Sequence, residues 1–395
     1  MELSQRVQNL TPSQTLAITA KAAELKAAGV DIIGLGAGEP DFNTPDEIIE
    51  KAFDAVKKGA TKYTPAAGIP ELKAAISQKM LRDHQLEYGS DEIFVASGAK
   101  HVLYNVFQAL IDSGDEVIIP SPYWVSYTEQ IKLAEGTPVL VYTDESTSFK
   151  LTPELLKENI TDKTKVLMLN SPNNPTGMVY SKEELEALAE VVAKNDLIVV
   201  ADEIYEVLVY GTEHHSIASV NEDMKARTVV INGVSKSHAM TGWRIGYACG
   251  DKALIKGLTG LASQSTSNPS TPSQWAAVAA YEMDRSFLTE FNETFRQRRD
   301  HAYNLLEEIP YTTCIKPEGA FYLFPNFKEC TDKMGYDTVD DFVKDLLENA
   351  HVAVVPGSAF GLEDNIRISY STSEEVMTEA ITRIKNFVTE RLEGV

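Results

Sequence analysis

The 395-residue sequence contains only three cysteines, which argues against structures that depend on thiols. Cys249, Cys314 and Cys330 form no C-x-x-C pair and are odd in number. We therefore expect neither a disulfide framework nor a thiolate zinc site, and the composition fits a reducing compartment such as the cytoplasm. The seven histidines show no H-E-x-x-H spacing, and we interpret the adjacent pair His214-His215 as part of a polar loop. No metal site is predicted.

Long apolar runs and an excess of basic residues are also absent from the sequence. No segment approaches the roughly 20 consecutive apolar residues of a membrane span. The first residues, MELSQR, show no basic stretch followed by an apolar one, so no secretory signal is predicted. Lysine and arginine total 36 against 58 aspartate and glutamate, which gives a net charge of −22. Nucleic acids and anionic membranes require a positive field, so neither is expected as a partner. A dianionic substrate would need local cations in its pocket.

The middle of the chain alternates between strand-like and helix-like segments. Several of its β-rich runs are apolar at every position, as expected for strands covered by helices on both faces. Helical patterns lie between the runs: one follows Gly98, and both Ser181 with Glu184 and Thr44 with Glu47 have the spacing of a capping box, with Pro45 at the first helical position. The pattern predicts a wound α/β domain with a mostly parallel seven-stranded sheet. The seven runs are 92–96, 116–120, 138–142, 165–169, 197–201, 228–232 and 245–249.

The length of the chain favours two domains. From about residue 291 the pattern changes to helices rich in Arg and Glu around a few strand-like runs. We assign a large α/β domain to residues 44–290. A smaller α+β domain is assigned to residues 1–43 and 291–395, because a helix at about 13–28 precedes the wound core. The C-terminal strand-like runs are 320–324, 352–355 and 365–370.

Polar and aromatic residues follow the predicted strands at their carboxyl ends. Ligands bind beyond these ends in an open α/β sheet, so the groups mark a candidate site. No G-x-G-x-x-G opens the first βα unit, which argues against a nicotinamide dehydrogenase. The segments that follow the strands are Ser97-Gly98-Ala99-Lys100, Ser121-Pro122-Tyr123-Trp124, 170–177 (NSPNNPTG), Asp202-Glu203-Ile204-Tyr205 and Gly233-Val234-Ser235-Lys236.

The motifs SGAK, SPYW, SPNNPTG, DEIY, SKxxAMTGWRIGY and NIRISYS occur in the order found in one enzyme family. They resemble the fold-type-I, class I aminotransferases, and most of all the bacterial aspartate aminotransferase branch. The resemblance extends from GAGEPDF at 36–42 to RISYS at 367–371. It implies a pyridoxal-phosphate (PLP) enzyme that transfers the amino group of L-aspartate to 2-oxoglutarate, giving oxaloacetate and L-glutamate. Its partners would be amino acids and 2-oxo acids, and it would act as a homodimer with shared active sites.

The resemblance assigns the catalytic roles to Lys236, Asp202 and Tyr205. The Lys236 amine would form a Schiff base with PLP and would later act as base and acid, which requires a lysine that can lose its proton. Asp202 would pair with the pyridine nitrogen and keep it protonated, so that the ring accepts electrons. Tyr205 and Asn174 would hydrogen-bond the phenolic oxygen of the cofactor. Without the family motifs, Lys236 would be interpreted as a surface lysine and Asp202 as a helix N-cap.

The resemblance also implies the remaining contacts of the cofactor. Its phosphate would be bound by Arg244 and by the start of a helix at Gly98, Ala99 and Lys100, since free N–H groups and the helix dipole suit an anion. Trp124 would stack on the pyridine ring, and Tyr63 would reach the phosphate of the neighbouring subunit. The family often has a hydroxyl residue three positions before the lysine, where this chain has Gly233. Ser235 is then the hydroxyl candidate that remains.

Substrate recognition follows from the same resemblance. Arg367 would clamp the α-carboxylate, for which a planar guanidinium is suited, and Gly38 would let the backbone approach it. Trp124 and Asn174 would also face the substrate. In the bacterial aspartate branch a lysine and a threonine bind the distal carboxylate, and Lys100 and Thr15 match them. A lysine linked to prephenate use matches Thr11 here, which argues against that activity.

Alternative functions remain open at this point. An aromatic, alanine or kynurenine aminotransferase, or another fold-type-I PLP enzyme such as a carbon–sulfur lyase, would keep the cofactor and change the substrate or the chemistry. A non-enzymatic, aminotransferase-like module that senses an effector is usually fused to a DNA-binding domain. The sequence shows neither such a domain nor a basic patch.

Overall fold

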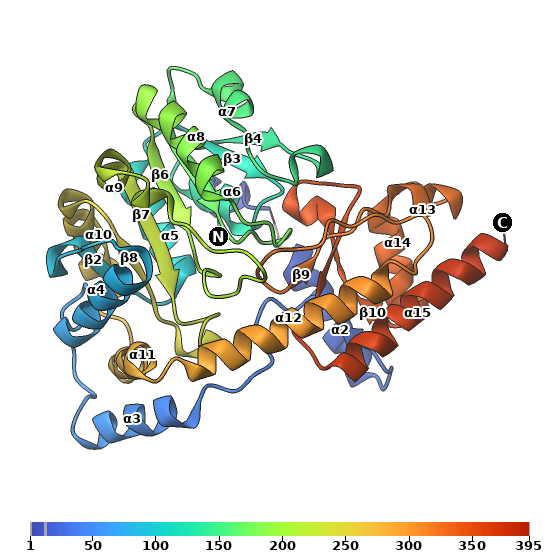
Figure 1. The fold of residues 1–395 in the computed structure, drawn as a ribbon, viewed down its shortest axis with the longest axis horizontal. Helices are drawn as coiled ribbons and strands as arrows, with labels where there is room; N and C mark the ends of the chain where they lie inside the picture. The colour runs from blue at the N-terminus through green and yellow to red at the C-terminus, as the bar shows by residue number, and fades with distance from the viewer. Residues whose placement is uncertain (1, 12–13, 395) are drawn as a thin grey trace.

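The computed structural model describes residues 2–11 and 14–394, with the side chains of 14–16 outside the description. Its main feature is a seven-stranded sheet in the order β2-β8-β7-β6-β5-β3-β4 (Figure 1). Neighbouring strands pair in parallel, except that β8 is antiparallel to both β2 and β7. The predicted mostly parallel sheet is therefore confirmed. The strands are β2 (Ile93–Ala96), β3 (Glu116–Ser121), β4 (Thr137–Tyr142), β5 (Thr164–Asn170), β6 (Ile198–Asp202), β7 (Thr228–Gly233) and β8 (Gly246–Cys249).

Helices cover both faces of this sheet, which explains the continuous apolar runs of its strands. Successive residues of β5 point into different cores: Val166 and Met168 pack on one face, and Leu167 and Leu169 on the other. The first face is covered by α5 (Ala99–Leu110) and α10 (Lys252–Ser265). The helices associated with the other face are α3 (Asp46–Lys57), α4 (Pro70–His84), α7 (Pro153–Asn159), α8 (Lys182–Lys194), α9 (Glu222–Arg227) and α11 (Thr271–Glu282).

One of the two predicted capping boxes is confirmed and the other is wrong. The Ser181 hydroxyl accepts from Glu184 N, and the Glu184 carboxylate accepts from Ser181 N, so α8 begins as predicted. Helix α3 begins instead at Asp46, with Pro45 as its N-cap and no side-chain cap. The Thr44 hydroxyl donates to Ala239 O and accepts from Trp243 Nε1. The Thr44 hydroxyl therefore bonds residues distant in the sequence and does not form the helix cap that the local pattern had predicted.

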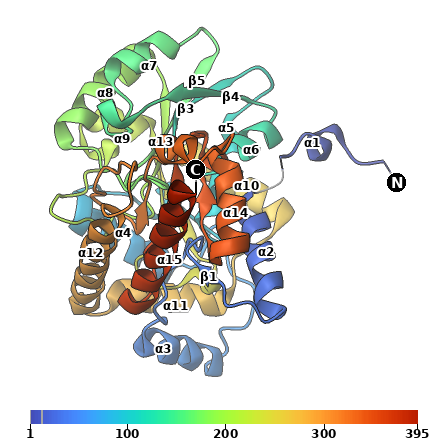
Figure 2. The same cartoon turned by 90° about the vertical axis from the view of Figure 1, so that its right-hand side faces the viewer.

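The C-terminal part of the chain forms a second body beside the sheet (Figures 1 and 2). Strands β11 (Val355–Pro356), β12 (Ile366–Ser369) and β9 (Tyr322–Leu323) form an antiparallel sheet in that order. An N-terminal strand, β1 (Ile33–Gly34), pairs in parallel with β10 (Val352–Ala353). The helices of this region are α2 (Gln14–Ala27), α12 (Ser286–Leu306), α13 (Lys328–Lys333), α14 (Val339–Asp345) and α15 (Glu374–Glu393).

The long helix α12 connects the two bodies, and its start at Ser286 places the predicted boundary at 290/291 inside the helix. Tyr205, in the turn that follows β6, packs in the same hydrophobic core as residues of α12 and α15. The domain assignment itself stays a prediction.

Among the residues described, none of the helices has both the length and the apolar character required to cross a membrane. Two further short α-helices are α1 (Gln5–Gln8) and α6 (Ser126–Leu133).

Candidate active site

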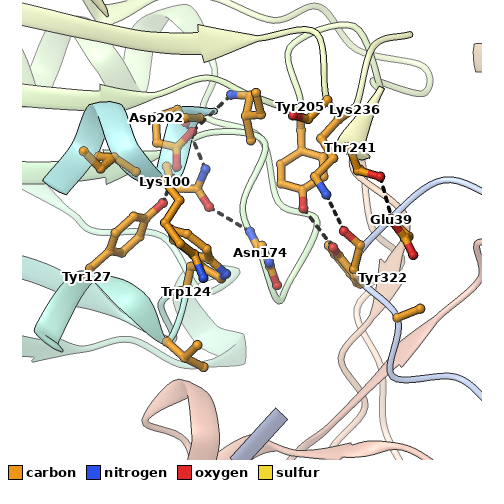
Figure 3. A pocket seen from close by; sticks show the side chains of 18 of the residues that line it. Glu39, Lys100, Trp124, Tyr127, Asn174, Asp202, Tyr205, Lys236, Thr241 and Tyr322 are labelled. Atoms are coloured by element: carbon orange, nitrogen blue, oxygen red, sulfur yellow. Dashed lines mark hydrogen bonds between the residues drawn. The ribbon is translucent and has the colours of Figure 1, made fainter. Parts of the chain in front are cut away.

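A cavity of about 490 Å³ opens where the carboxyl ends of the parallel strands face the C-terminal body. Side chains from both bodies point into it (Figure 3). Most of the residues predicted from the sequence line it: Gly38, Ala99, Lys100, Trp124, Asn174, Asp202, Tyr205, Ser235, Lys236, Arg244 and Arg367.

Two predicted residues, Gly98 and Tyr63, are not part of that lining, and the side chain of a third lies outside the description. Gly98 lies just behind the lining as the N-cap of α5. Tyr63 is 90% exposed and does not line the cavity of its own chain. The side chain of Thr15 lies outside the described part of the structure, so the structure does not bear on its predicted role.

Lys236 lies in the turn after β7 and reaches across to the other body. Its Nζ donates a hydrogen bond to the carbonyl oxygen of Gly38 (Figure 3). Burial lowers the pKa of the Lys236 amine to about 8, and the nearby guanidinium groups of Arg367 and Arg244 act in the same direction. A lysine in this state can lose its proton near neutral pH, as a nucleophile or a general base must.

Asp202 ends β6 and lies in register with Asn170 at the end of β5. Its Oδ2 accepts a hydrogen bond of 2.7 Å from the Tyr127 hydroxyl, and its Oδ1 accepts one of 3.2 Å from Ile204 N. Only 4% of Asp202 is exposed. Burial raises the pKa of its carboxyl to about 6, although the Tyr127 hydrogen bond lowers it. The structure thus holds a buried carboxyl group, whose ionised form would be stabilised by a cationic partner.

Arg367 is a buried cation without an acidic partner among the described residues. Its Nη1 donates to Asn174 Oδ1 and its Nη2 to Gly36 O, at 2.9 and 2.8 Å. Its Nε is buried without a hydrogen-bond partner. The guanidinium lies over the rings of Tyr322 and Phe360, 4.5 and 4.8 Å from their centroids. Because a buried charge is costly unless it is paired, this arrangement favours an anionic ligand beside Arg367.

A second anion-binding region lies at the start of α5. The N-cap of this helix is Gly98, which offers no side-chain cap, so the first N–H groups of the helix are available. A Cβ on Gly98 would lie 2.5 Å from Arg244 Nη2, and its φ is +90°, so only glycine brings the loop and the guanidinium so close. The Lys100 ammonium lies 4.8 Å from the centroid of the Trp124 ring. Helix N–H groups, a guanidinium and an aromatic face are the chemistry that a phosphorylated pyridine ring such as PLP requires, so the residues present fit it.

The structure adds pocket residues that sequence reasoning missed. Tyr127 bonds Asp202, and the Tyr322 hydroxyl lies 2.8 Å from the Tyr205 hydroxyl. The Thr241 hydroxyl donates to Glu39 Oε2 at 2.7 Å. Tyr322 lies in the strand-like run 320–324, but no sequence signal indicated that its hydroxyl faces the site. For Tyr127 the only signal was its position three residues after Trp124.

A separate polar cluster lies under the site, around Glu206. Its carboxylate accepts from His84 Nε2 at 2.6 Å and contacts the buried Lys79 ammonium. His214 lies in a loop, as predicted, but its imidazole is buried, with Nε2 3.3 Å from Glu203 Oε2. The side chains of His84, Glu203, Glu206 and His214 are close enough to hold a metal ion. Lys79 already supplies a cation there, and we interpret the cluster as an ion-pair network.

Comparison with known proteins places this site in a family. The family model for aminotransferase class I and II matches residues 30–384. The chain is 57% identical to the aspartate aminotransferase of Bacillus subtilis, with 98% of this chain and 99% of that protein covered. It is 56% identical to the aspartate aminotransferase of Geobacillus stearothermophilus, over 99% and 100% of the two chains.

The fold also agrees with solved structures over nearly the whole chain. The aspartate aminotransferase from Rhizobium meliloti superposes with a TM-score of 0.95 at 45% identity, covering 98% of this chain and 99% of that chain. The Thermus thermophilus aspartate aminotransferase with maleate gives 0.93 at 45% identity, over 98% and 99%. Sequence motifs, fold and cavity therefore agree, and the chain belongs to the class I and II aminotransferase family.

Proposed function

We propose that this protein is a PLP-dependent aspartate aminotransferase that moves the amino group of L-aspartate onto 2-oxoglutarate. The observation that carries the proposal is that two cationic side chains, Arg367 and Lys100, line the same cavity as the buried amine of Lys236. A dicarboxylate has two negative ends, and the protein carries a net charge of −22, which repels such a substrate. Two separate cations in the cavity would attract the two carboxylates locally.

The cofactor side of the proposal uses Lys236 and Asp202. PLP, when bound, supplies a ring that accepts electrons from the substrate. Lys236 Nζ would hold the cofactor covalently and, once released as a free amine with a lowered pKa, would accept the proton of the substrate Cα. Asp202 would hold the proton on the ring nitrogen, since a buried carboxylate favours a cationic partner. Arg244 and the first turn of α5 would bind the phosphate.

The substrate side uses the two cations at different positions. Arg367 would bind the α-carboxylate with its free Nε and its Nη groups, whose fork matches a carboxylate. Lys100, with Thr15, would bind the distal carboxylate. Support comes from the relatives named aspartate aminotransferase and from the Thermus thermophilus structure with maleate, itself a dicarboxylate. A relative from Aquifex aeolicus, 48% identical, is named a probable aspartate/prephenate aminotransferase. Thr11 here stands where we expect a lysine for prephenate.

Three further features belong to the same proposal. We expect a homodimer in which Tyr63 reaches the phosphate site of the partner, since an exposed fraction of 90% leaves this ring free to do so. Residues 44–290 would form the large domain and residues 1–43 and 291–395 the small one, and the cavity would then lie between the two domains. A cytoplasmic location is consistent with three free cysteines.

Profiling of amino donors and keto acids tests the proposal. Purified protein supplied with PLP should be yellow and should use aspartate or glutamate with 2-oxoglutarate or oxaloacetate. Alanine, phenylalanine and kynurenine should have a much lower kcat/KM. A higher kcat/KM for a neutral donor would favour an alternative aminotransferase, and a protein that binds no PLP would overturn the whole assignment.

A further inference from the structure

Tyr127 lies at the start of α6, 75 residues before Asp202, yet the two side chains form a buried pair. Tyr127 is 1% exposed and Asp202 is 4% exposed. The tyrosine hydroxyl donates to Asp202 Oδ2 at 2.7 Å, the length of a strong charge-assisted hydrogen bond. Figure 3 shows the hydroxyl directed at the carboxylate from the side of the cavity that holds Trp124.

The same tyrosine also supports Trp124. The two rings pack edge to face, with centroids 5.3 Å apart and an interplanar angle of 77°. Tyr127 therefore contacts both side chains that we assign to the cofactor ring, Asp202 at the ring nitrogen and Trp124 at the ring face. Its hydroxyl acts on the first and its aromatic body on the second, so the two contacts can be separated by mutation.

Asp202 has few other donors to hold it in place. Within the described part of the chain, its Oδ1 receives only the longer bond from Ile204 N, at 3.2 Å. A carboxylate can rotate about its χ2 angle, and one backbone bond to one oxygen leaves that rotation weakly restrained. The Tyr127 hydroxyl fixes the second oxygen. Each oxygen of an ionised carboxylate retains capacity for a further donor, so the restraint does not block a ring nitrogen.

We propose that Tyr127 is a positioning residue for the aminotransferase reaction, whose hydroxyl orients the ionised Asp202 carboxylate toward the cofactor ring nitrogen. The proposal rests on the proposed function, because Asp202 needs a ring nitrogen to act on. It assigns to Tyr127 no contact with substrate and no proton transfer of its own. The effect of removing the hydroxyl should therefore appear in the state of the cofactor ring and in kcat, while KM for aspartate is preserved.

The test uses the holoenzyme and the variant Tyr127→Phe, which keeps the ring packed on Trp124. Protein loaded with PLP carrying ¹⁵N in the ring should give a ring-nitrogen NMR signal of the protonated form in the wild type, shifted toward the unprotonated form in Tyr127→Phe. We expect kcat to fall about 10- to 100-fold, the range for losing a hydrogen bond to a charged group, and the Kd for PLP to rise. KM for aspartate should change by less than about 3-fold.

Tyr370→Phe is the matched control. Tyr370 is 0% exposed, and its hydroxyl donates to a backbone carbonyl, Ala320 O, at 3.1 Å, away from the cavity lining. It loses a buried hydroxyl without affecting Asp202, so kcat and the ¹⁵N signal should match the wild type. An equal loss in this control would mean that any buried hydroxyl matters, and the proposal would be wrong.

A double-mutant cycle shows whether Tyr127 acts through Asp202. In the Asp202→Asn background, Tyr127→Phe should have little further effect on kcat, whereas independent roles would give additive losses and overturn the proposal. If Tyr127→Phe does not fold, 3-fluorotyrosine at position 127 keeps the hydroxyl but changes its strength as a donor, and an unchanged ¹⁵N signal would refute the proposal. A wild type that binds no PLP would overturn the proposed function and this inference together, whereas a normal wild type with a normal Tyr127→Phe overturns this inference alone.

Discussion

The guanidinium of Arg367 donates a hydrogen bond from Nη1 to the side-chain oxygen of Asn174 at 2.9 Å, across 193 positions of the chain. Arg367 comes from β12 in the C-terminal body, and Asn174 from the loop after β5 in the large sheet. The bond therefore joins the two bodies at the cavity. It occupies one nitrogen of the guanidinium, while Nε is buried without a hydrogen-bond partner.

Arg367 and Lys100, two of the cationic side chains that line the cavity, should have different effects when they are replaced. Arg367→Ala should lower kcat/KM for every amino donor, because all share the α-carboxylate. Lys100→Ala should lower kcat/KM for aspartate and glutamate about 10- to 100-fold more than for alanine or phenylalanine, since a hydrogen bond to a charged group contributes roughly 1.5–3 kcal/mol. Steady-state kinetics of both variants on acidic and neutral donors measure this difference.

Lys51→Ala serves as the control for loss of a lysine. Lys51 lies on α3 and pairs with Glu47 on the surface, with 48% of its side chain exposed. Its removal should leave the donor preference unchanged. If Lys100→Ala lowers activity on every donor equally, Lys100 supports the phosphate helix, and the aspartate assignment loses its main residue.

Asp202→Asn should reduce transamination by at least about 10²-fold. Asparagine keeps the size of the side chain but removes the charge that would hold a proton on the ring nitrogen. Turnover of aspartate with 2-oxoglutarate is the measurement. Asp251→Asn is the control, because the Asp251 carboxylate caps α10 by accepting from Ala253 N and Leu254 N. Activity of Asp202→Asn close to that of the control would show that Asp202 also serves only as a cap.

The rate of cofactor attachment should increase with pH through about 8. The neutral amine of Lys236 is the nucleophile, and burial lowers its pKa from 10.5 to about 8. The neutral fraction therefore grows as the pH rises and levels off well below the range of an ordinary lysine. Apoprotein mixed with PLP at pH 6 to 10 and followed by absorbance gives the profile. Lys236→Ala should show no covalent band at any pH, and a midpoint near 10.5 in the wild type would contradict the prediction.

Glu206→Gln should destabilise the fold by about 3 kcal/mol or more. The substitution leaves the Lys79 ammonium, only 4% exposed, without its carboxylate, and an unpaired buried charge is costly. The lysine and histidine contacts, which outweigh burial, hold the pKa of Glu206 well below its ordinary value. Its ionised form therefore stabilises the protein above a pH of about 4.3, the ordinary glutamate value, and this stability is lost as the pH falls further. Chemical denaturation at neutral and acidic pH measures both effects.

The exposed pair of Glu47 and Lys51 provides the comparison. Both side chains are about half exposed, so Glu47→Gln should change the free energy of unfolding by less than about 0.5 kcal/mol. Equal effects of the two substitutions would mean that the network around Glu206 does not depend on its charge.

The sequence by itself determined the seven strands of the large sheet, because each is a short apolar run, and the run can be recognised without knowledge of its neighbours in the sheet. It also determined which segments end at the cavity, since the carboxyl ends of parallel strands share one edge of the sheet. The local hydrogen bonds were predictable at Ser181, whose hydroxyl keeps its partner in the helix, and the prediction failed at Thr44, whose hydroxyl bonds Ala239 and Trp243 instead.

Only the tertiary structure decided which side chains meet across the chain. The Tyr127 hydroxyl and Asp202 are 75 positions apart, and Lys236 Nζ meets Gly38 O across 198. His214 is buried against Glu203, although the local pattern around it is that of a polar loop. Such contacts depend on how the two bodies pack and on the direction of each side chain. Patterns along the chain reveal which face of an element is buried, but not which partner lies opposite.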